Sequence, residues 1–208
     1  MSENERTPAF SLLSFLATVF RKRKTKFVVH PDGSWDITDP PADLSYAWDL
    51  LSWDGWFLKA RDLFHAASLM EPRILAPDPL PFGVYGAYFM LVAFGIENLC
   101  KGQIVRDRLE ELRAEGLANV ERNQPPFPVL PKFLKEHNLL DLAEVLRIDT
   151  NQDEEELLRR LTDSSVWSGR YPVPRFPREL TNSSFSDDDV YRIRALIEKI
   201  RDRTDRRK

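Results

Sequence analysis

The sequence predicts an all-α protein: an up-down bundle of about five helices that follows an N-terminal accessory segment. Two observations predict this fold class. Apolar residues recur at alternating steps of three and four along most of the chain, which is the spacing of one face of a helix. Spans rich in proline separate these stretches and end any helix that reaches them. We expect two regions, an extension over residues 1–42 and a helical bundle over residues 43–208.

The composition is that of an ordinary soluble globular protein, since hydrophobic residues make up 42% and charged residues 30% of the 208 residues. A net charge of −3 neither favours nor excludes nucleic acid as a partner. The single cysteine, Cys100, excludes an internal disulfide framework and a cysteine-rich metal site. The three histidines stand apart from one another and from acidic clusters, so no metal site is expected. We therefore expect a cytoplasmic protein with a buried thiol and no cofactor.

The N-terminal extension carries an apolar stretch, Phe10–Phe20, followed by a basic run. The stretch is too short to span a bilayer, and its positive charges follow it, whereas a signal peptide carries them in front. Two short apolar segments around His30–Ser34 predict a short β-hairpin. The basic run is either a solvated stretch or a surface for nucleic acid or anionic lipid, formed by Arg21, Lys22, Arg23, Lys24 and Lys26. Peripheral membrane contact through residues 10–26 is the less favoured alternative.

The first two helices of the bundle are the longest. One is expected over about residues 44–70 and the other over about residues 83–115. The first half of the second helix is apolar all round, which indicates the most buried helix of the bundle. Gly86 and Gly95 lie on it, and we expect both to let a neighbouring element approach closely.

Three shorter helices follow. The third is expected over about residues 131–147. Either Thr150 or Asn151 can cap the fourth, whose first turn carries four acidic residues that suit the helix dipole. The last helix is expected to start at Ser186, where Asp189 takes the place of the usual glutamate in a capping box.

A junction between the last two helices, Trp167–Pro177, breaks the helical pattern because three prolines stop any helix there. It places Arg170 beside Tyr171. Two interpretations stay open for this pair. One is a latch in which Tyr171 packs and Arg170 donates to the carbonyls of a helix end. The other is a contact to the phosphate or the base of a nucleotide.

Four stretches of the chain, in order, resemble motifs of the HEPN domain, a helical domain of prokaryotic toxins, defence proteins and nucleotidyltransferase partners. They resemble the family's first long helix, its second-helix signature, the start of its third helix and the Arg-Tyr-Pro break before its last helix: residues 56–67, 93–102, 136–142 and 169–172. The resemblance covers roughly residues 45–204. It implies an all-α bundle, often dimeric. In many members it implies a metal-independent ribonuclease site with an arginine and a histidine four to six residues apart.

The ribonuclease spacing that the family implies is not found in the helical core of this sequence. Arg61 and His65 have only three residues between them. Arg23 and His30 have six between them, but they belong to the N-terminal hairpin region. No histidine follows Arg170. The sequence therefore argues against an enzyme that uses the family's usual mechanism.

Three residues of the bundle are candidates for a polar site. Glu97 and Lys101 stand one turn apart, so they form either an ion pair on the helix surface or a polar site facing the bundle, with Glu97 accepting from Arg170. His137, near the start of the third helix, is either a structural residue or a group for proton transfer near neutral pH. The catalytic candidates are Arg170 and His137, and the binding candidates are Glu97, Lys101, Arg170 and Tyr171.

The leading functional hypothesis follows from the resemblance. It is a non-catalytic or degenerate HEPN-like module that binds RNA, a nucleotide or a protein partner in a prokaryotic defence or toxin–antitoxin context, and that can form a homodimer. A divergent metal-independent ribonuclease using Arg170 with His137 is the first alternative. The second is a helical oligomerisation protein without a ligand.

Overall fold

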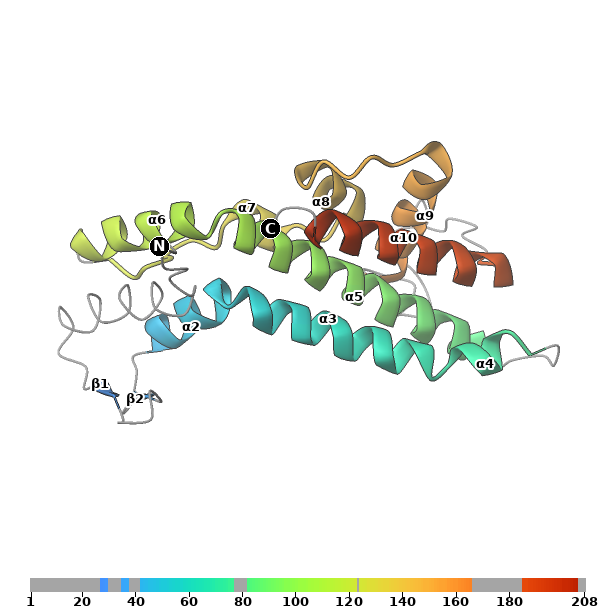
Figure 1. Cartoon of the computed structure of the whole chain (residues 1–208), viewed down its shortest axis with the longest axis horizontal. Helices are drawn as coiled ribbons and strands as arrows, with labels where there is room; N and C mark the ends of the chain where they lie inside the picture. The colour runs from blue at the N-terminus through green and yellow to red at the C-terminus, as the bar shows by residue number, and fades with distance from the viewer. Residues whose placement is uncertain are drawn as a thin grey trace, which may run out of the picture. The chain divides into compact units, whose positions relative to one another are not determined.

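Helices dominate the structure, a computed structural model that describes residues 27–29, 35–37, 42–76, 82–122, 124–165 and 185–205 (Figure 1). The predicted all-α class is confirmed over these residues. A short two-stranded ladder precedes the helices, in which β1 (Phe27–Val29) pairs antiparallel with β2 (Trp35–Ile37). The residues between the two strands lie outside the described part of the chain.

The chain divides into two compact units. The smaller unit comprises residues 1–51 and 108–130, and the larger unit comprises residues 52–107 and 131–208. The predicted division after residue 42 is not one of the boundaries between these units, and it stays a prediction.

The described helices of the smaller unit are α2 (Ala42–Leu51) and α6 (Leu109–Glu121). Leu112 and Val120, eight residues apart on one face of α6, are buried. After α6, Asn119 Nδ2 donates a hydrogen bond to the carbonyl of Pro126 at 2.8 Å, which ties the following loop to the helix.

Three of the five predicted helical regions are each broken into two helices. The first breaks at Ser52, between α2 and α3 (Trp53–Ser68). The second breaks at Arg108, between α5 (Phe82–Asp107) and α6. Acidic residues lie in the first turn of both α3 and α6, where negative charge stabilises the start of a new helix. The continuous apolar periodicity concealed these start signals.

The third predicted helix consists of two short helices, α7 (Lys132–Lys135) and α8 (Leu139–Val145), with three residues between them. The last two regions, α9 (Gln152–Asp163) and α10 (Asp187–Asp205), each form one helix, as expected. A single turn, α4 (Glu71–Ile74), follows α3.

Of the two candidate caps for α9, the structure uses Asn151. Its Oδ1 accepts from the backbone N–H of Glu154 at 3.0 Å, and Glu154 Oε2 accepts from the backbone N–H of Asn151 at 2.9 Å. The capping box expected at α10 is half formed. Asp189 Oδ2 accepts from the backbone N–H of Ser186 at 2.9 Å, but the N–H of Asp189 donates to the Ser186 carbonyl rather than to its hydroxyl.

The central helix of the larger unit is α5, against which α3, α8, α9 and α10 pack (Figure 1). Gly95 on α5 permits the close approach that was predicted, since an added Cβ would lie 2.4 Å from the Phe64 ring of α3. The same expectation for Gly86 is wrong for the described residues, since apart from its chain neighbours and its own helix backbone none of them places an atom within 4 Å of the position of its Cβ. Gly102, which was not singled out, meets Phe57 in the same way, with 2.8 Å to its ring. Among the described helices, none combines the length and the apolar character that crossing a membrane requires.

Candidate functional site

Glu97, Lys101 and His137 come together at the carboxyl-terminal half of α5. Lys101 Nζ donates to Glu97 Oε1 at 2.7 Å, and His137 Nδ1 lies 3.1 Å from the same oxygen. His137 reaches Glu97 from the three-residue link between α7 and α8, forty positions further along the chain. We call these three residues the Glu97 cluster.

Burial separates the members of the Glu97 cluster. The side chains of Lys101 and Glu97 are only 3% and 9% exposed, whereas that of His137 is 59% exposed. The pair therefore lies inside the larger unit and not on a solvated helix surface. Lys101 Nζ also donates to the carbonyl of Leu134 near the end of α7, at 3.0 Å, so a buried ammonium joins α5 to α7. Buried charges persist only when they are paired in this way.

The backbone on either side of His137 is fixed by hydrogen bonds. Glu136 Oε1 accepts from the N–H groups of His137, at 3.1 Å, and Asn138, at 3.0 Å. Asn138 is the N-cap of α8, since its Oδ1 accepts from the N–H of Leu140 at 3.0 Å. The imidazole is thus placed by its own link as well as by Glu97.

Glu97 has one oxygen to spare. Its Oε2 is buried, and no described residue makes a hydrogen bond to it. An unsatisfied carboxylate oxygen in a protein interior is costly and is seldom left without a donor. Arg170, which was predicted to donate to Glu97, lies outside the described residues, and so does Tyr171.

The geometry of His137 suits proton transfer. An Nδ1–H group donated to Glu97 fixes one tautomer of the neutral ring and leaves Nε2 as the acceptor. No described residue makes a hydrogen bond to Nε2, and the ring is open to solvent. In many enzymes a carboxylate that accepts a hydrogen bond from one ring nitrogen of a histidine orients the other nitrogen as a general base, and Glu97 and His137 have this arrangement.

Two lysines that sequence reasoning missed lie on α7, just before His137 in the chain. Lys132 and Lys135 stand three residues apart on α7 and are exposed, while Phe133 and Leu134 between them are buried. The pattern of two apolar residues between two lysines was visible in the sequence, but the prediction placed it inside one long third helix. Three groups that can carry positive charge therefore occur within six residues.

The structure describes only some of the other sequence candidates. The five basic residues at 21–24 and 26 lie outside the described part of the chain. His65 is exposed on α3, a helix that carries none of the Glu97 cluster. Cys100 is buried as expected, and burial raises the pKa of its thiol to about 12, with the Glu97 carboxylate adding to the rise and Lys101 opposing it. The thiol is therefore protonated and unreactive at neutral pH.

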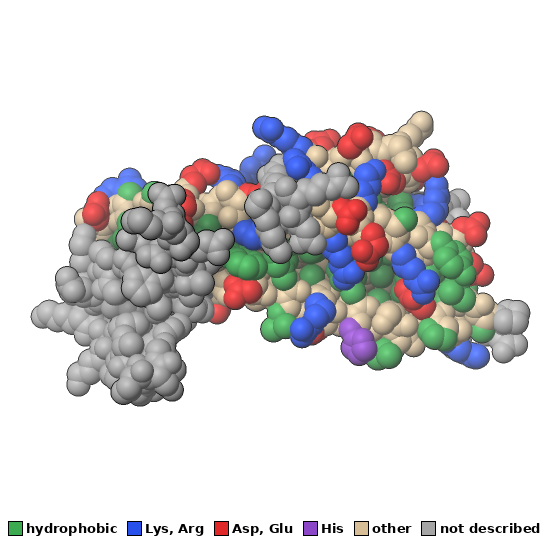
Figure 2. Space-filling view, viewed as in Figure 1, with side chains coloured by type: hydrophobic (Ala, Val, Ile, Leu, Met, Phe, Trp, Pro, Cys, Tyr) green, Lys and Arg blue, Asp and Glu red, His purple; other side chains and the backbone are tan. Residues whose placement is uncertain are grey.

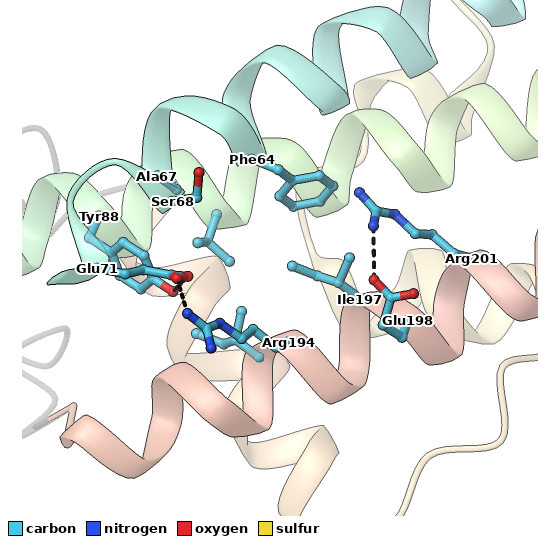
Figure 3. A pocket seen from close by; sticks show the side chains of 11 residues that line it. Phe64, Ala67, Ser68, Glu71, Tyr88, Arg194, Ile197, Glu198 and Arg201 are labelled. Carbon is cyan, nitrogen blue, oxygen red and sulfur yellow. Dashed lines mark hydrogen bonds and ion pairs between the residues drawn. The ribbon is translucent and has the colours of Figure 1, made fainter. Parts of the chain in front are cut away.

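A cavity of about 170 Å³ lies between α3, α4, α5 and α10 (Figure 3). Its apolar lining includes Phe64, Val92 and Ile197, and its rim carries two arginines. Arg194 is paired with Glu71, and Arg201 is paired with Glu198 at 2.8 Å. Because each arginine is already paired within the protein, we assign no ligand to this cavity.

Charge of both signs is distributed over the larger unit. On the face drawn in Figure 2, blue and red side chains alternate over its described helices, and no extended patch of one sign is seen there. Attraction of a charged ligand to that face would depend on local groups and not on a broad field.

Among the described residues, no group of three His, Cys, Asp or Glu side chains is arranged to hold a metal ion. Comparison with known proteins gives no match to a protein-family model, to a curated protein or to a solved structure. Function must therefore be argued from the site.

Proposed function

We propose that this protein is a HEPN-like module that binds RNA through the surface around His137 and does not cleave it. The observation that carries the proposal is an exposed imidazole held at 3.1 Å by a carboxylate that is itself paired with a buried lysine. Exposed Lys132 and Lys135 lie beside it in sequence and supply charge for phosphate groups. The family, a homodimer and a role in prokaryotic defence or a toxin–antitoxin pair are part of the same proposal, and they rest on the sequence resemblance.

Binding to single-stranded RNA can be measured by fluorescence anisotropy in EDTA at several salt concentrations. Replacing Lys132 and Lys135 with alanine should weaken binding and reduce the slope of log K against log[salt] by about 0.7 for each phosphate that the lysines no longer neutralise. Adding His137→Ala to the double lysine variant should weaken RNA binding further. The matched control is Lys59→Ala, which removes an exposed lysine from α3 and should leave the affinity unchanged.

The basic run at residues 21–26 needs a separate variant. A chain that lacks residues 1–30 should still bind RNA if the surface around His137 is the main site. If deletion abolishes binding and the lysine variants do not change it, the proposed site is wrong and the N-terminal run is the binding element.

A second candidate function is metal-independent RNA cleavage. It is favoured by the contact between His137 Nδ1 and Glu97, which leaves Nε2 on the solvent side as a proton acceptor. In this alternative His137 accepts the proton of a ribose 2′-hydroxyl, and Arg170 neutralises the scissile phosphate. The structure describes the contact of His137 with Glu97, whereas Arg170 lies outside the described residues.

Incubation of labelled RNA with the protein in EDTA separates the two candidates. Under the binding proposal the RNA stays intact. Under the cleavage alternative it is cut, and both His137→Ala and Arg170→Ala lose the activity. Cutting that persists in Arg170→Ala would exclude the two-residue mechanism.

A further inference from the structure

A second and larger cavity, of about 510 Å³, lies where the turn after α8 meets the carboxyl-terminal half of α10. None of the residues that line it belongs to the Glu97 cluster. A volume of this size falls within the range of small-molecule sites. Its charged lining residues are Arg147, Asp149, Glu198, Lys199, Asp202 and Arg203.

Two arginines in this cavity have no partner in the described part of the chain. Arg147 and Arg203 come from different segments, and neither makes an ion pair or a hydrogen bond with a described side chain. Arg203 Nε is buried and has no hydrogen-bond partner. By contrast, Lys199 pairs with Glu154 at 2.7 Å, and Glu198 pairs with Arg201 at 2.8 Å. The cavity thus holds two guanidinium groups available for an anion.

Arg147 occupies an unusual backbone position. It has a φ of 55°, the only positive φ among the described residues other than glycine. It ends α8 in a Schellman motif, in which the N–H of Arg147 donates to the carbonyl of Glu144 and the N–H of Ile148 to that of Ala143. Glycine is the residue usually found here, because it has no Cβ to oppose this conformation. The chain instead carries a long cationic side chain that lines the cavity.

The opposite wall of the cavity comes from α10. Ala195, Lys199 and Arg203 recur every fourth residue and therefore share one face of this helix. Ala195 contributes only a methyl group, so space remains beside the two longer side chains. Asp149, which has no ion pair with a described residue, supplies a carboxylate that can accept hydrogen bonds from hydroxyl groups.

We propose that this cavity binds a nucleoside 5′-monophosphate. Arg147 and Arg203 bind the phosphate, since two guanidinium groups can each donate a pair of hydrogen bonds to its oxygens. Asp149 accepts from the ribose hydroxyls, which accounts for an acidic group beside an anion site. The base occupies the space next to Ala195. The inference is independent of RNA binding at His137.

Isothermal titration with AMP, with adenosine and with inorganic phosphate tests the proposal on the full chain. AMP should bind, and the other two should bind much more weakly. Arg147→Gly should weaken AMP binding by about tenfold or more, because it removes charged hydrogen bonds, and its thermal unfolding should show a protein at least as stable as wild type. Ala195→Leu, which fills the cavity without changing its charge, should also abolish binding, and Arg61→Gln is the control that should bind normally.

Each other outcome overturns the assignment. If AMP does not bind, or if Arg147→Gly binds it as wild type does, the site is wrong. If adenosine binds as tightly as AMP, the arginines do not bind the phosphate. If inorganic phosphate binds as tightly as AMP, the cavity does not recognise the nucleoside. His137→Ala should leave AMP binding intact, so failure here is distinguishable from failure of the RNA-binding proposal.

Discussion

Arg160 donates two hydrogen bonds to Asp189, one from each terminal nitrogen and each 2.9 Å long. The Asp189 side chain is 3% exposed and the Arg160 side chain 15% exposed. The pair joins α9 to the first turn of α10, the two helices between which the chain passes through residues 166–184. The Arg160 guanidinium also lies 5.1 Å from the centre of the Phe185 ring. A bidentate pair of this kind is specific in its geometry.

Arg160→Met should lower the free energy of unfolding by about 3 kcal/mol, because it leaves Asp189 buried without its main partner. The control is the neighbouring residue Arg159, which pairs with Glu155 at 3.0 Å but is half exposed. Arg159→Met should change stability by less than about 0.5 kcal/mol. Urea denaturation of both variants measures the difference in the free energy of unfolding. Equal losses would show that the buried Arg160–Asp189 pair contributes no more than the exposed Arg159–Glu155 pair.

Acid should weaken the same contact. Burial alone would raise the pKa of Asp189, but hydrogen bonds from Arg160 and the Ser186 backbone, together with the charges of Arg160 and Arg192, hold it below its ordinary value of 3.8. A carboxyl group with a lowered pKa contributes stability that is fully present above its ordinary pKa and is lost as the pH falls through the lowered value. The stability advantage of wild type over Asp189→Asn should therefore be constant above about pH 5 and shrink below about pH 4. A difference that grows with acid would contradict this linkage.

Two glycines of α5 should respond in opposite ways to the same substitution. Gly86→Ala should raise stability by about 0.5 to 1 kcal/mol, since its Cβ enters open space and alanine favours the helix. Gly95→Ala should lower stability by about 1 to 2 kcal/mol, because its Cβ would lie 2.4 Å from the Phe64 ring. Thermal melts of the two variants compare them directly. Adding Phe64→Leu to Gly95→Ala should restore part of the lost stability, whereas adding it to Gly86→Ala should give no such gain.

Arg147→Gly should stabilise the protein by about 1 kcal/mol, because a φ of 55° opposes any residue with a Cβ. Arg147→Ala tests the cause, since it removes the same charge but keeps the Cβ. That variant should stay within about 0.5 kcal/mol of wild type. If alanine stabilises as much as glycine does, the gain comes from the loss of charge and not from the backbone.

The buried pair of the Glu97 cluster, Glu97 and Lys101, should behave as one unit in stability measurements. Lys101→Met removes the donor at 2.7 Å and leaves a buried carboxylate, so it should cost about 3 kcal/mol. Replacing both residues of the buried pair, as Glu97→Leu with Lys101→Met, should cost less than Lys101→Met alone, because no buried charge is left unpaired. A double variant as unstable as the sum of the single changes would mean that the two side chains do not interact.

The helical regions could be predicted from the sequence because apolar periodicity reports directly on which face of a helix is buried. The breaks at Ser52 and Arg108 could not, since the periodic pattern runs through both positions. The signal that follows each break is acidic residues in the first turn of the next helix, a local preference worth at most about 1 kcal/mol, and neither Ser52 nor Arg108 caps its helix with a side-chain hydrogen bond. Such a preference is small beside the hydrophobic signal of a long helix.

Each residue of the candidate site could be identified from the sequence, but the sequence did not predict that the three lie close together in the fold. Glu97 and Lys101 share a helix, so four residues of spacing already place them together. His137 joins them only because α7 ends after one turn and Glu136 holds the following link. A single third helix over residues 131–147 would have placed His137 in its interior. Contacts between segments distant in sequence depend on such turns, which no periodicity encodes.

Glu97 Oε1 serves the buried Lys101 and the exposed His137 at once. One oxygen atom therefore has two roles: it neutralises a buried charge in the core, and it orients a side chain at the surface. A random library at position 97 screened only for folding should already reject most substitutions, and one screened only for ligand binding should reject nearly the same set. At position 137, by contrast, the screen for folding should accept most substitutions, and the screen for ligand binding should accept few. The position with the least freedom to evolve would then be one that solvent hardly reaches.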